Sequence, residues 1–553
     1  MNHFISGIIK IIILEAHVGL LLVDALTKDR FEKQKKFAFL TLSALMVFAW
    51  CNYGTFNGAG LKLVHHHEQF HFYLAAKYQQ EVGWFDLYRA AVLADAETTR
   101  ALNVQQIRDN ATFELEPVSK AFAERERIVG RFGPRWEEFK RDWELLMTPP
   151  NLADLEACEA RRCNDVSTLM QCRAQCEQER AQGTAAWRSR FNSILQDHGN
   201  SNSPAWSVIT HPISRVVPWT PGGQAFLGWL DMALMAFMWW FIFKTFGWKP
   251  AAIGMLMWAT PPLVFPYLAG SFLRWDWLFC LGMTICMMKR EKWLYAGLFF
   301  GFAVATKLFP LWFGVALFFR AAVTCWRDKK IHAKYKQMVA GTFASGTAAV
   351  LLAAFMFGGF WVWADYKKRI DAAVVERFYS IQYSLRTVYL QIEESSAGEL
   401  AVHWLFPREM KQGRADVDIN DHQLGFKFFQ LLFTLAVFVL ILRTDEVGAF
   451  TLGPILVFTW LVVNMYYWNM LGLMALGLAT RQDQKPALGA LMGLQAIFMG
   501  YYLYQHTNHG FSEGYMVALQ LCVWLLVFAW FELKVVRAEL RDLVSMLYGR
   551  KRA

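Results

Sequence analysis

The stretch WLYAGLFFGFAVATKLFPLWF, residues 293–313, carries one charged side chain, Lys307, between two apolar blocks. Blocks of this kind recur along the 553-residue chain, which is 55% hydrophobic and 18% charged. A helix needs about 20 apolar residues to cross the ~30 Å hydrocarbon core of a bilayer. Backbone polar groups find no water there, and blocks this long exclude a barrel strand, so each block is expected to be a helix. The sequence therefore predicts an all-α polytopic membrane protein.

Twelve apolar blocks are interpreted as membrane crossings. They lie near residues 38–56, 222–246, 251–270, 276–289, 293–307, 309–326, 338–363, 424–443, 448–464, 467–481, 488–505 and 514–533. Residues 4–26 are also apolar, but Lys10, His17 and Asp24 recur every seven residues and form one polar stripe on a helix. This segment is expected to be either a thirteenth span or a helix in the membrane interface.

Basic segments predict the orientation of this bundle. They are Lys28–Lys36, Lys289–Lys292, Arg327–Lys330 and Arg550–Arg552. All of them fall on one side of the twelve-span arrangement, and the positive-inside rule makes that side cytoplasmic. We therefore expect a multi-pass protein of a bacterial inner membrane with periplasmic long loops. These segments account for much of the net charge of +10, so membrane lipids rather than nucleic acid are the expected partners.

The predicted organisation follows from the spans and the two long connections. It consists of an N-terminal interfacial or transmembrane helix with a basic cytoplasmic segment (1–37), a span (38–56), a periplasmic loop domain (57–221), further spans (222–363), a second periplasmic loop (364–423), further spans (424–533) and a basic cytoplasmic tail (534–553). The first loop is polar, helix-prone and long enough to form a small domain of its own.

Four of the nine cysteines cluster in the first long loop, namely Cys158, Cys163, Cys172 and Cys176. The stretch that holds them is interpreted as two short helices joined by a turn, in which Cys158 can face Cys176 and Cys163 can face Cys172. Two nested disulfides would suit an oxidising periplasm. A four-thiolate zinc site is the alternative, but the paired two-residue spacing of such sites is absent.

The segment HHHEQFHFY, residues 65–73, directly follows a predicted span. The carboxylate of Glu68 would lie at the membrane surface, where it could deprotonate an acceptor hydroxyl as a general base. Its donor would be membrane-bound, because soluble sugar nucleotides are cytoplasmic. The segment's histidines, residues 65, 66, 67 and 71, could bind a divalent metal or could donate to phosphate and backbone. A solvated loop carboxylate is the alternative interpretation of Glu68.

Three cations elsewhere are candidates for binding a phosphate. Arg274 and Asp276 flank Trp275 at the outer end of a predicted span, where they could hold a donor and an acceptor or merely anchor the helix at the interface. Lys307 lies beside a proline between two apolar blocks, which indicates a broken helix at a polar cavity or a lysine that reaches the interface. Arg386 lies in the second long loop and could bind the same phosphate or be an ordinary loop cation.

Several segments together carry a resemblance to a known family. They are EQFHFY at 68–73 with Ala76 and Leu87-Tyr88, the stretch from Ser203-Pro204 through His211-Pro212 to Pro218, Ala296-Gly297 with Gly301, Lys307 and Pro310, and QYSLR at 382–386. Their order resembles the GT-C glycosyltransferases, and specifically the polyprenyl-phosphate-sugar-dependent glycosyltransferase family 87. Glu68 stands at the position of that family's catalytic base.

The resemblance implies a GT-C-like bundle of 12–13 transmembrane helices that transfers a sugar from a polyprenyl-phosphate donor to a periplasmic or lipid-linked acceptor. Glu68 would take the acceptor proton in a direct, inverting displacement, while cations compensate the departing phosphate. The substrate-binding residues expected are His67, His71, Tyr73, Arg274, Asp276, Lys307 and Arg386. No cofactor is required, although a divalent metal could be accommodated.

The sequence also departs from the family pattern. Gly270-Ser271-Phe272-Leu273 replaces a G-Q-x-N segment, Asn464–Leu471 lacks two histidines of a late motif, and position 68 is Glu rather than Asp. A divergent transferase with another substrate would explain these changes. So would a non-catalytic subunit that docks a membrane-protein partner through the first loop. A secondary transporter would need paired polar residues at mid-membrane and an inverted repeat, and neither is clear in the sequence.

Overall fold

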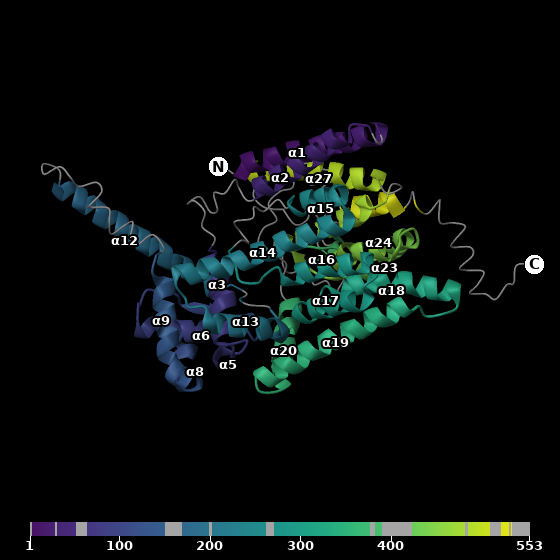
Figure 1. Cartoon of the computed structure of the whole chain (residues 1–553). Helices are drawn as coiled ribbons and strands as arrows, with labels where there is room; N and C mark the ends of the chain where they lie inside the picture. Colours follow the sequence, from purple (N-terminus) through teal and green to yellow (C-terminus); the bar gives the residue numbers. More distant parts are fainter. Residues whose placement is uncertain are drawn as a thin grey trace, which may run out of the picture.

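The computed structural model shows a mostly helical chain (Figure 1). The residues that it describes are 3–27, 30–50, 64–149, 169–197, 199, 202–260, 270–375, 382–386, 388–389, 423–481, 485–508, 521–529 and 532. Strands in this part of the chain form two short antiparallel pairs, β1 (Gln106–Arg108) with β2 (Leu115–Pro117) and β3 (Gln382–Tyr383) with β4 (Val463–Asn464). The predicted all-α class is therefore confirmed.

Short helices of the first long loop fold around their own core. They are α3 (His66–Gln69), the π-helix η3 (Phe70–Leu74), α4 (Ala75–Lys77), α5 (Gln79–Val82), α6 (Leu87–Glu97), α7 (Ser119–Ala123), α8 (Arg125–Phe132), the 3-10 helix η4 (Gly133–Arg135), α9 (Trp136–Met147), the projecting α12 (Leu169–Ile194) and α13 (Pro204–Val216). Phe70, Tyr88, Trp143 and Phe191 lie in this core, which continues to Phe272. We call this unit the loop domain.

The remaining helices, most of them apolar, form the second part, which we call the bundle. They are α1 (His3–Thr27), α2 (Glu32–Trp50), α14 (Pro221–Phe246), α15 (Trp248–Trp258), α16 (Asp276–Lys289), α17 (Trp293–Thr306), α18 (Leu311–Asp328), α19 (Ala333–Met356), α20 (Trp361–Val375), α23 (Gln423–Leu442), α24 (Glu446–Thr451), α25 (Gly453–Trp460), the 3-10 helix η7 (Met465–Met470), α26 (Leu471–Ala479) and α27 (Lys485–Asn508). Residues 521–529 are also helical. Figure 1 shows the loop domain at one end of the bundle.

Three described helices are long and apolar enough to cross a membrane: Pro221–Phe246, Ala333–Met356 and Leu424–Leu442. Four shorter apolar helices are Trp293–Thr306, Glu446–Trp460, Tyr467–Ala479 and Pro486–Ile497. The predicted blocks near 276–289 and 293–307 do form helices, but each has 14 residues, fewer than a straight crossing needs. Membrane association is thus indicated, while the full count of crossings and their sides stay predictions.

The polar stripe of residues 4–26 faces protein. Lys10, His17 and Asp24 are all buried on α1, which packs along α2 and α27. The Asp24 carboxylate forms one ion pair with Lys35 of α2, at 3.2 Å, and a second with Lys249 at the start of α15. Asp24 is therefore paired on this face, as intramembrane charges usually are. The His17 ring instead packs edge-on against Phe39, and both of its nitrogens are buried without a hydrogen-bond partner among the described residues.

Small residues let two bundle helices approach closely. A Cβ atom added to Gly297 of α17 would lie 2.2 Å from the carbonyl oxygen of Met338, and one added to Gly341 of α19 would lie 2.2 Å from that of Leu294. A Cβ atom added to Gly301, one turn further along α17, would lie 2.2 Å from the carbonyl oxygen of Thr342. The A-G-x-x-x-G segment is therefore the contact surface of α17 with α19, as small residues commonly are between membrane helices.

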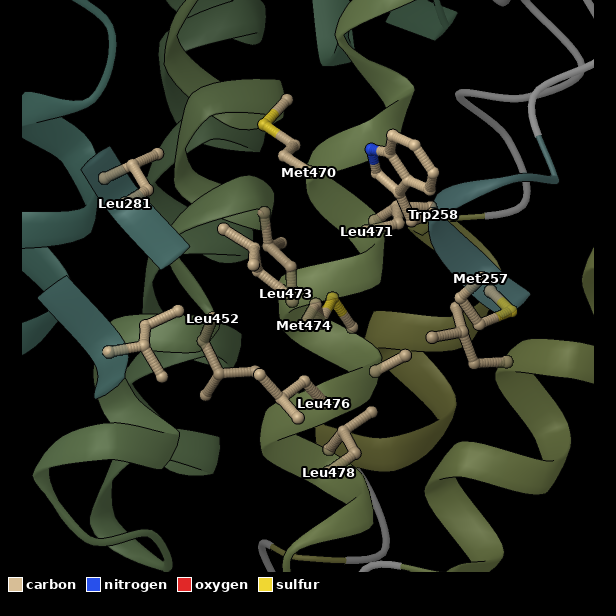
Figure 2. Close-up of a cluster of buried hydrophobic side chains, with 14 of the residues drawn as sticks. Met257, Trp258, Leu281, Leu452, Met470, Leu471, Leu473, Met474, Leu476 and Leu478 are labelled. Carbon is tan, nitrogen blue, oxygen red and sulfur yellow. The ribbon is translucent and has the colours of Figure 1, made fainter. Parts of the chain in front are cut away.

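Figure 2 shows how α26 fills the bundle core with leucine and methionine side chains. Met257 and Trp258 of α15 lie on one side of α26, and Leu281 and Leu452 lie on the other. A buried amide crosses this apolar region, because the Asn469 side chain donates to the carbonyl of Trp258 at 2.6 Å. The late motif of the sequence is thereby fixed against α15.

Candidate functional site

The segment that begins the loop domain is fixed to the bundle by backbone and amide hydrogen bonds. The His65 backbone N–H donates to the carbonyl of Gly270 at 3.1 Å. The Gln69 amide donates to the same carbonyl at 2.8 Å and to that of Gln224 at 2.9 Å. The His65 ring caps α3 by accepting from the Glu68 N–H at 3.2 Å. These bonds position Glu68 at the seam between the loop domain and the bundle.

A π-helical turn follows directly. Residues Phe70–Leu74 continue α3 as η3, and π-turns inside helices are often found at functional sites. Its side chains are buried, and Tyr73 donates its hydroxyl proton to the Val217 carbonyl at 2.7 Å while its ring packs on Trp219. The structure thus gives Tyr73 a packing role in the loop-domain core, and its expected contact with substrate stays a prediction.

Glu68 and Arg274 form an ion pair. Their side chains are only 15% and 12% exposed. Burial alone would raise the pKa of the Glu68 carboxyl, but the positive charge of Arg274 and the neighbouring histidines outweigh it and hold the pKa below its ordinary value. The carboxylate is therefore ionised near neutral pH, and the guanidinium is the group that keeps it so.

Asp231 of α14 positions Arg274. Its carboxylate accepts the backbone N–H groups of Arg274 and Trp275, both at 3.0 Å, and the Ser271 hydroxyl at 3.3 Å. The sequence places Asp231 inside a predicted span, where it must face protein or a cavity, and the structure shows it buried against this loop. Its role is to fix the backbone that presents the guanidinium.

The same loop contains an unusual backbone conformation. Leu273 has a φ of 48°, in the left-handed region that bulky side chains avoid. The indole of Trp206 donates to the Leu273 carbonyl at 2.8 Å, so a neighbouring helix holds the residue in place. Conformations of this kind cost of order 1–3 kcal/mol and persist where the surroundings determine them. The loop before Arg274 is therefore held in a single arrangement.

Two further charged residues lie close to the Glu68–Arg274 pair. Asp276 begins α16, is buried, and has one carboxylate oxygen without a hydrogen-bond partner among the described residues. Lys307 follows the last residue of α17, and α18 begins only at Leu311, so the predicted break in the helix is confirmed. Buried Lys307 interacts electrostatically with Asp276, Arg274 and Glu68. We call these four residues the charged cluster.

Three aromatic side chains that follow the cluster residues or the late motif in sequence pack against one another. The ring of Trp277 lies 4.8 Å from that of Phe309 and 5.5 Å from that of Tyr467, and the rings of Phe309 and Tyr467 are 4.8 Å apart. Trp277 follows Asp276, Phe309 follows Lys307 by two residues, and Tyr467 belongs to the late motif at 464–471. The start of α16, the break after α17 and the late motif thus meet through these three rings.

The second long loop joins the same region through β3. Gln382 pairs with Asn464 and Tyr383 with Val463, so the QYSLR segment lies beside the late motif. Arg386 is three residues beyond this pair. The structure therefore brings QYSLR into the region where several segments of the resemblance converge, whereas the role expected for Arg386 on a phosphate stays a prediction.

His67 of α3 and His71 of η3 form a group with Asp197 close to Glu68. The His67 ring nitrogen Nε2 is 2.8 Å from the Asp197 carboxylate, and His71 Nε2 is 2.7 Å from the Tyr88 hydroxyl, which donates to the Asp197 carbonyl at 3.1 Å. Burial lowers the pKa of His71 to about 3. Burial would also lower the pKa of His67, but the bond to Asp197 and the charge of Glu68 outweigh it and raise the pKa.

His66, in contrast, points its ring at Trp187 of α12, with the ring centroids 4.7 Å apart. Burial lowers the pKa of His65, whose ring caps α3, to about 4. Of the predicted cysteines, Cys176 is buried on α12. Cys158 and Cys163 lie outside the described residues, as does the side chain of Cys172, so the nested pairing stays a prediction.

Sequence reasoning missed two residues of this site. Asp197 lies 130 residues after His67, and nothing in the loop sequence marks it as a partner. Arg369 of α20 is fully buried, donates to the Asn110 carbonyl at 2.8 Å, and interacts electrostatically with His71 and Lys307. His67 and His71 were both expected at the site, and the H-E-x-x-H spacing of residues 67–71 places them on one side of a helix.

Comparisons with known proteins leave this geometry as the main guide to function, because no family model, no curated protein and no solved structure matches the chain.

Proposed function

We propose that the chain is a membrane glycosyltransferase that moves a sugar from a polyprenyl-phosphate-linked donor to a periplasmic or lipid-linked acceptor. One observation carries the proposal: the Glu68–Arg274 pair lies at the seam of loop domain and bundle, with Lys307 within electrostatic reach. A carboxylate beside two cations suits a reaction in which a hydroxyl loses a proton while a phosphate departs.

The two cations would bind the donor phosphate. Arg274 presents a planar guanidinium that can hold two phosphate oxygens at once, and Lys307 adds a second positive charge. When the phosphate binds Arg274, the guanidinium no longer neutralises Glu68 alone, and the pKa of the carboxyl rises toward that of a useful base. Donor binding thus activates Glu68 at the moment when the acceptor must be deprotonated.

The transfer itself would be a single inverting displacement. Glu68 accepts the acceptor hydroxyl proton as that oxygen attacks the anomeric carbon of the sugar. The bond from this carbon to the phosphate oxygen breaks, and its electron pair stays on the phosphate, where Arg274 and Lys307 offset the added charge. Asp276, the second carboxylate of the charged cluster, would orient the acceptor. No nucleotide or redox cofactor takes part in these steps.

The proposal places the protein in a bacterial inner membrane with 12–13 spans and both long loops in the periplasm. The three long apolar helices and the basic segments on one predicted side support this placement. The lipid donor would then approach from the bilayer, and the aromatic side chains of Trp277, Phe309 and Tyr467 would contact its chain or sugar near the charged cluster.

The first prediction concerns Glu68→Gln, which keeps the size of the side chain and removes the base. We expect transfer to fall by about 10²–10⁴-fold. The measurement is mass spectrometry of polyprenyl-phosphate lipids and periplasmic glycans from cells that lack the protein, restored with wild type or variant at equal membrane abundance. Wild type should cure both an accumulated donor and a missing glycan, whereas the variant should cure neither.

The matched control is Glu126→Gln, since Glu126 is an exposed carboxylate of the same loop domain. It should behave as wild type. A glycan defect cured equally by wild type and Glu68→Gln would show that Glu68 is not the base. Absence of any lipid or glycan change on deletion would favour a non-catalytic subunit that binds a membrane-protein partner through the loop domain.

A further inference from the structure

A histidine pair and a distant carboxylate lie together beside the charged cluster. His67 and His71 are four residues apart, and their ring centroids are 4.9 Å apart. One ligand atom from each of His67, His71 and Asp197 lies within 4.8 Å of the others. We propose that these three side chains form a binding site for one divalent transition-metal ion, with Zn²⁺ the best fit.

The three side chains are held in place before any ion binds. His67 and Asp197 are already in contact at 2.8 Å, and Tyr88 links His71 to the Asp197 backbone through hydrogen bonds of 2.7 and 3.1 Å. His67 and Asp197 have side chains 35% and 42% exposed, so an ion can reach them from solvent. The site is thus partly built and accessible.

The distances between the three ligand atoms are somewhat longer than tetrahedral zinc coordination requires. Zinc bonds of about 2.0–2.2 Å place neighbouring ligand atoms about 3.3 Å apart. The ligand atoms of the three residues therefore need to approach each other by at most about 1.5 Å, which rotation of two imidazole rings can supply. The ion would replace the direct contact between His67 and Asp197, and the Tyr88 hydroxyl would remain as a hydrogen-bond partner of a ligand.

The donor set selects the type of ion. Two imidazole nitrogens and one carboxylate are a common zinc combination that leaves one position open for water or substrate. Mg²⁺ and Ca²⁺ prefer sites made of oxygen alone, which the two histidines do not provide. The proposal is independent of sugar transfer, because Glu68 pairs with Arg274 and is not among the three ligands.

The second prediction tests the site on the full-length chain purified in detergent with an affinity tag other than polyhistidine. The protein is stripped with a chelator, dialysed against Zn²⁺ at a low micromolar concentration, and assayed for bound metal by mass spectrometry. We expect about one zinc per chain in wild type. His67→Gln, His71→Gln and Asp197→Asn should each weaken zinc binding by at least about 10-fold.

His66→Gln is the matched control, because His66 belongs to the same histidine run but packs on Trp187. It should bind zinc as wild type does. Near-ultraviolet circular dichroism and gel filtration would show that each variant is folded. In addition, Co²⁺ in wild type should give the intense visible absorption of a four- or five-coordinate site, and this band should disappear on addition of Zn²⁺.

Three results would overturn the proposal: a stripped wild type that takes up less than about a tenth of an equivalent of zinc, folded His67→Gln and Asp197→Asn variants that bind as wild type, or an equal loss in His66→Gln. Glu68→Gln should bind zinc as wild type does, because Glu68 is not among the three ligands. Failure of the two proposals is therefore distinguishable: Glu68→Gln tests sugar transfer, and the His67, His71 and Asp197 variants test zinc binding.

Discussion

The loop domain and the bundle are stabilised by different interactions. In the loop domain, Arg89 donates to both carboxylate oxygens of Glu116, at 2.6 and 2.8 Å. The Asp86 carboxylate forms ion pairs with Arg89, Arg127 and Arg131. In the bundle, α17 and α19 are in contact through glycines and have no ion pair between them in the described residues. The loop domain thus contains a network of paired charges, whereas the α17–α19 contact of the bundle depends on close packing of small residues.

The difference follows from the surroundings expected for each part. Lipid is as apolar as leucine, so helices in a membrane gain little from burying apolar side chains and depend on contact at short range. A water-exposed domain gains from apolar burial and can include charges if each one is paired. The candidate site lies where the two parts meet, and it combines an ion pair that joins them with a broken helix of the bundle.

The largest effect that would sharpen this comparison is expected for Arg89→Met. The substitution leaves the carboxylates of Glu116 and Asp86 with fewer partners, and breaking a buried pair costs about 3–5 kcal/mol. Hydrogen exchange of the full-length chain should show this loss in peptides of the loop domain and not in those of α17 and α19. Arg125→Met is the control, since its pair with Glu97 is half-exposed, and it should cost less than about 1 kcal/mol.

A smaller effect, confined to the bundle, is expected for Gly297→Ala. The added methyl group would meet the Met338 carbonyl at 2.2 Å and force α17 away from α19. Overpacking of this kind costs about 1–3 kcal/mol. The loss should appear in the thermal midpoint of the detergent-solubilised protein and in exchange of α17 and α19 peptides. Gly489→Ala is matched, because nothing lies within 4 Å of its added Cβ; similar losses in both variants would contradict the packing argument.

The smallest effect is a pH dependence of the loop domain. Burial raises the pKa of Asp86, but Arg127, Arg89 and Arg131 outweigh it and hold the pKa below its ordinary value of 3.8. Because the unfolded chain then binds a proton that the folded chain does not, the stabilisation is present above pH 3.8 and is lost as the pH falls toward the folded pKa. The loss should reach about 1 kcal/mol per pH unit for this group.

Asp86→Asn tests this origin. The variant should be less stable at pH 7 and should lose less on acidification from pH 5 to pH 3, measured by hydrogen exchange of residues 84–97 in the full-length chain. Glu116, whose pKa is also held down by Arg89, retains part of the dependence. If Asp86→Asn loses as much stability between pH 5 and pH 3 as wild type does, other carboxylates control acid stability. The contrast with the bundle would then rest on Arg89 alone.

Local features of the chain were predictable from the sequence. Hydropathy predicted many helices of the bundle, and the Lys307–Pro310 stretch predicted the break between α17 and α18. The block near 338–363 was expected to be one span, but α19 ends at Met356 and α20 begins at Trp361. What could not be predicted is pairing at long range. Asp197 meets His67 and Asp231 holds Arg274 only because the fold closes loops of 130 and 43 residues, which no local periodicity encodes.

Asp24 has a consequence for the order in which the chain assembles. Its partner Lys35 is synthesised soon afterwards, but Lys249 emerges 225 residues later, and α27, which packs along α1, comes near the end of the chain. The neighbours of α1 are therefore complete only after the chain through α27 has been synthesised. Until then the polar side chains on this face of α1 lack the neighbours that bury them, so the final packing of α1 waits for the synthesis of α27.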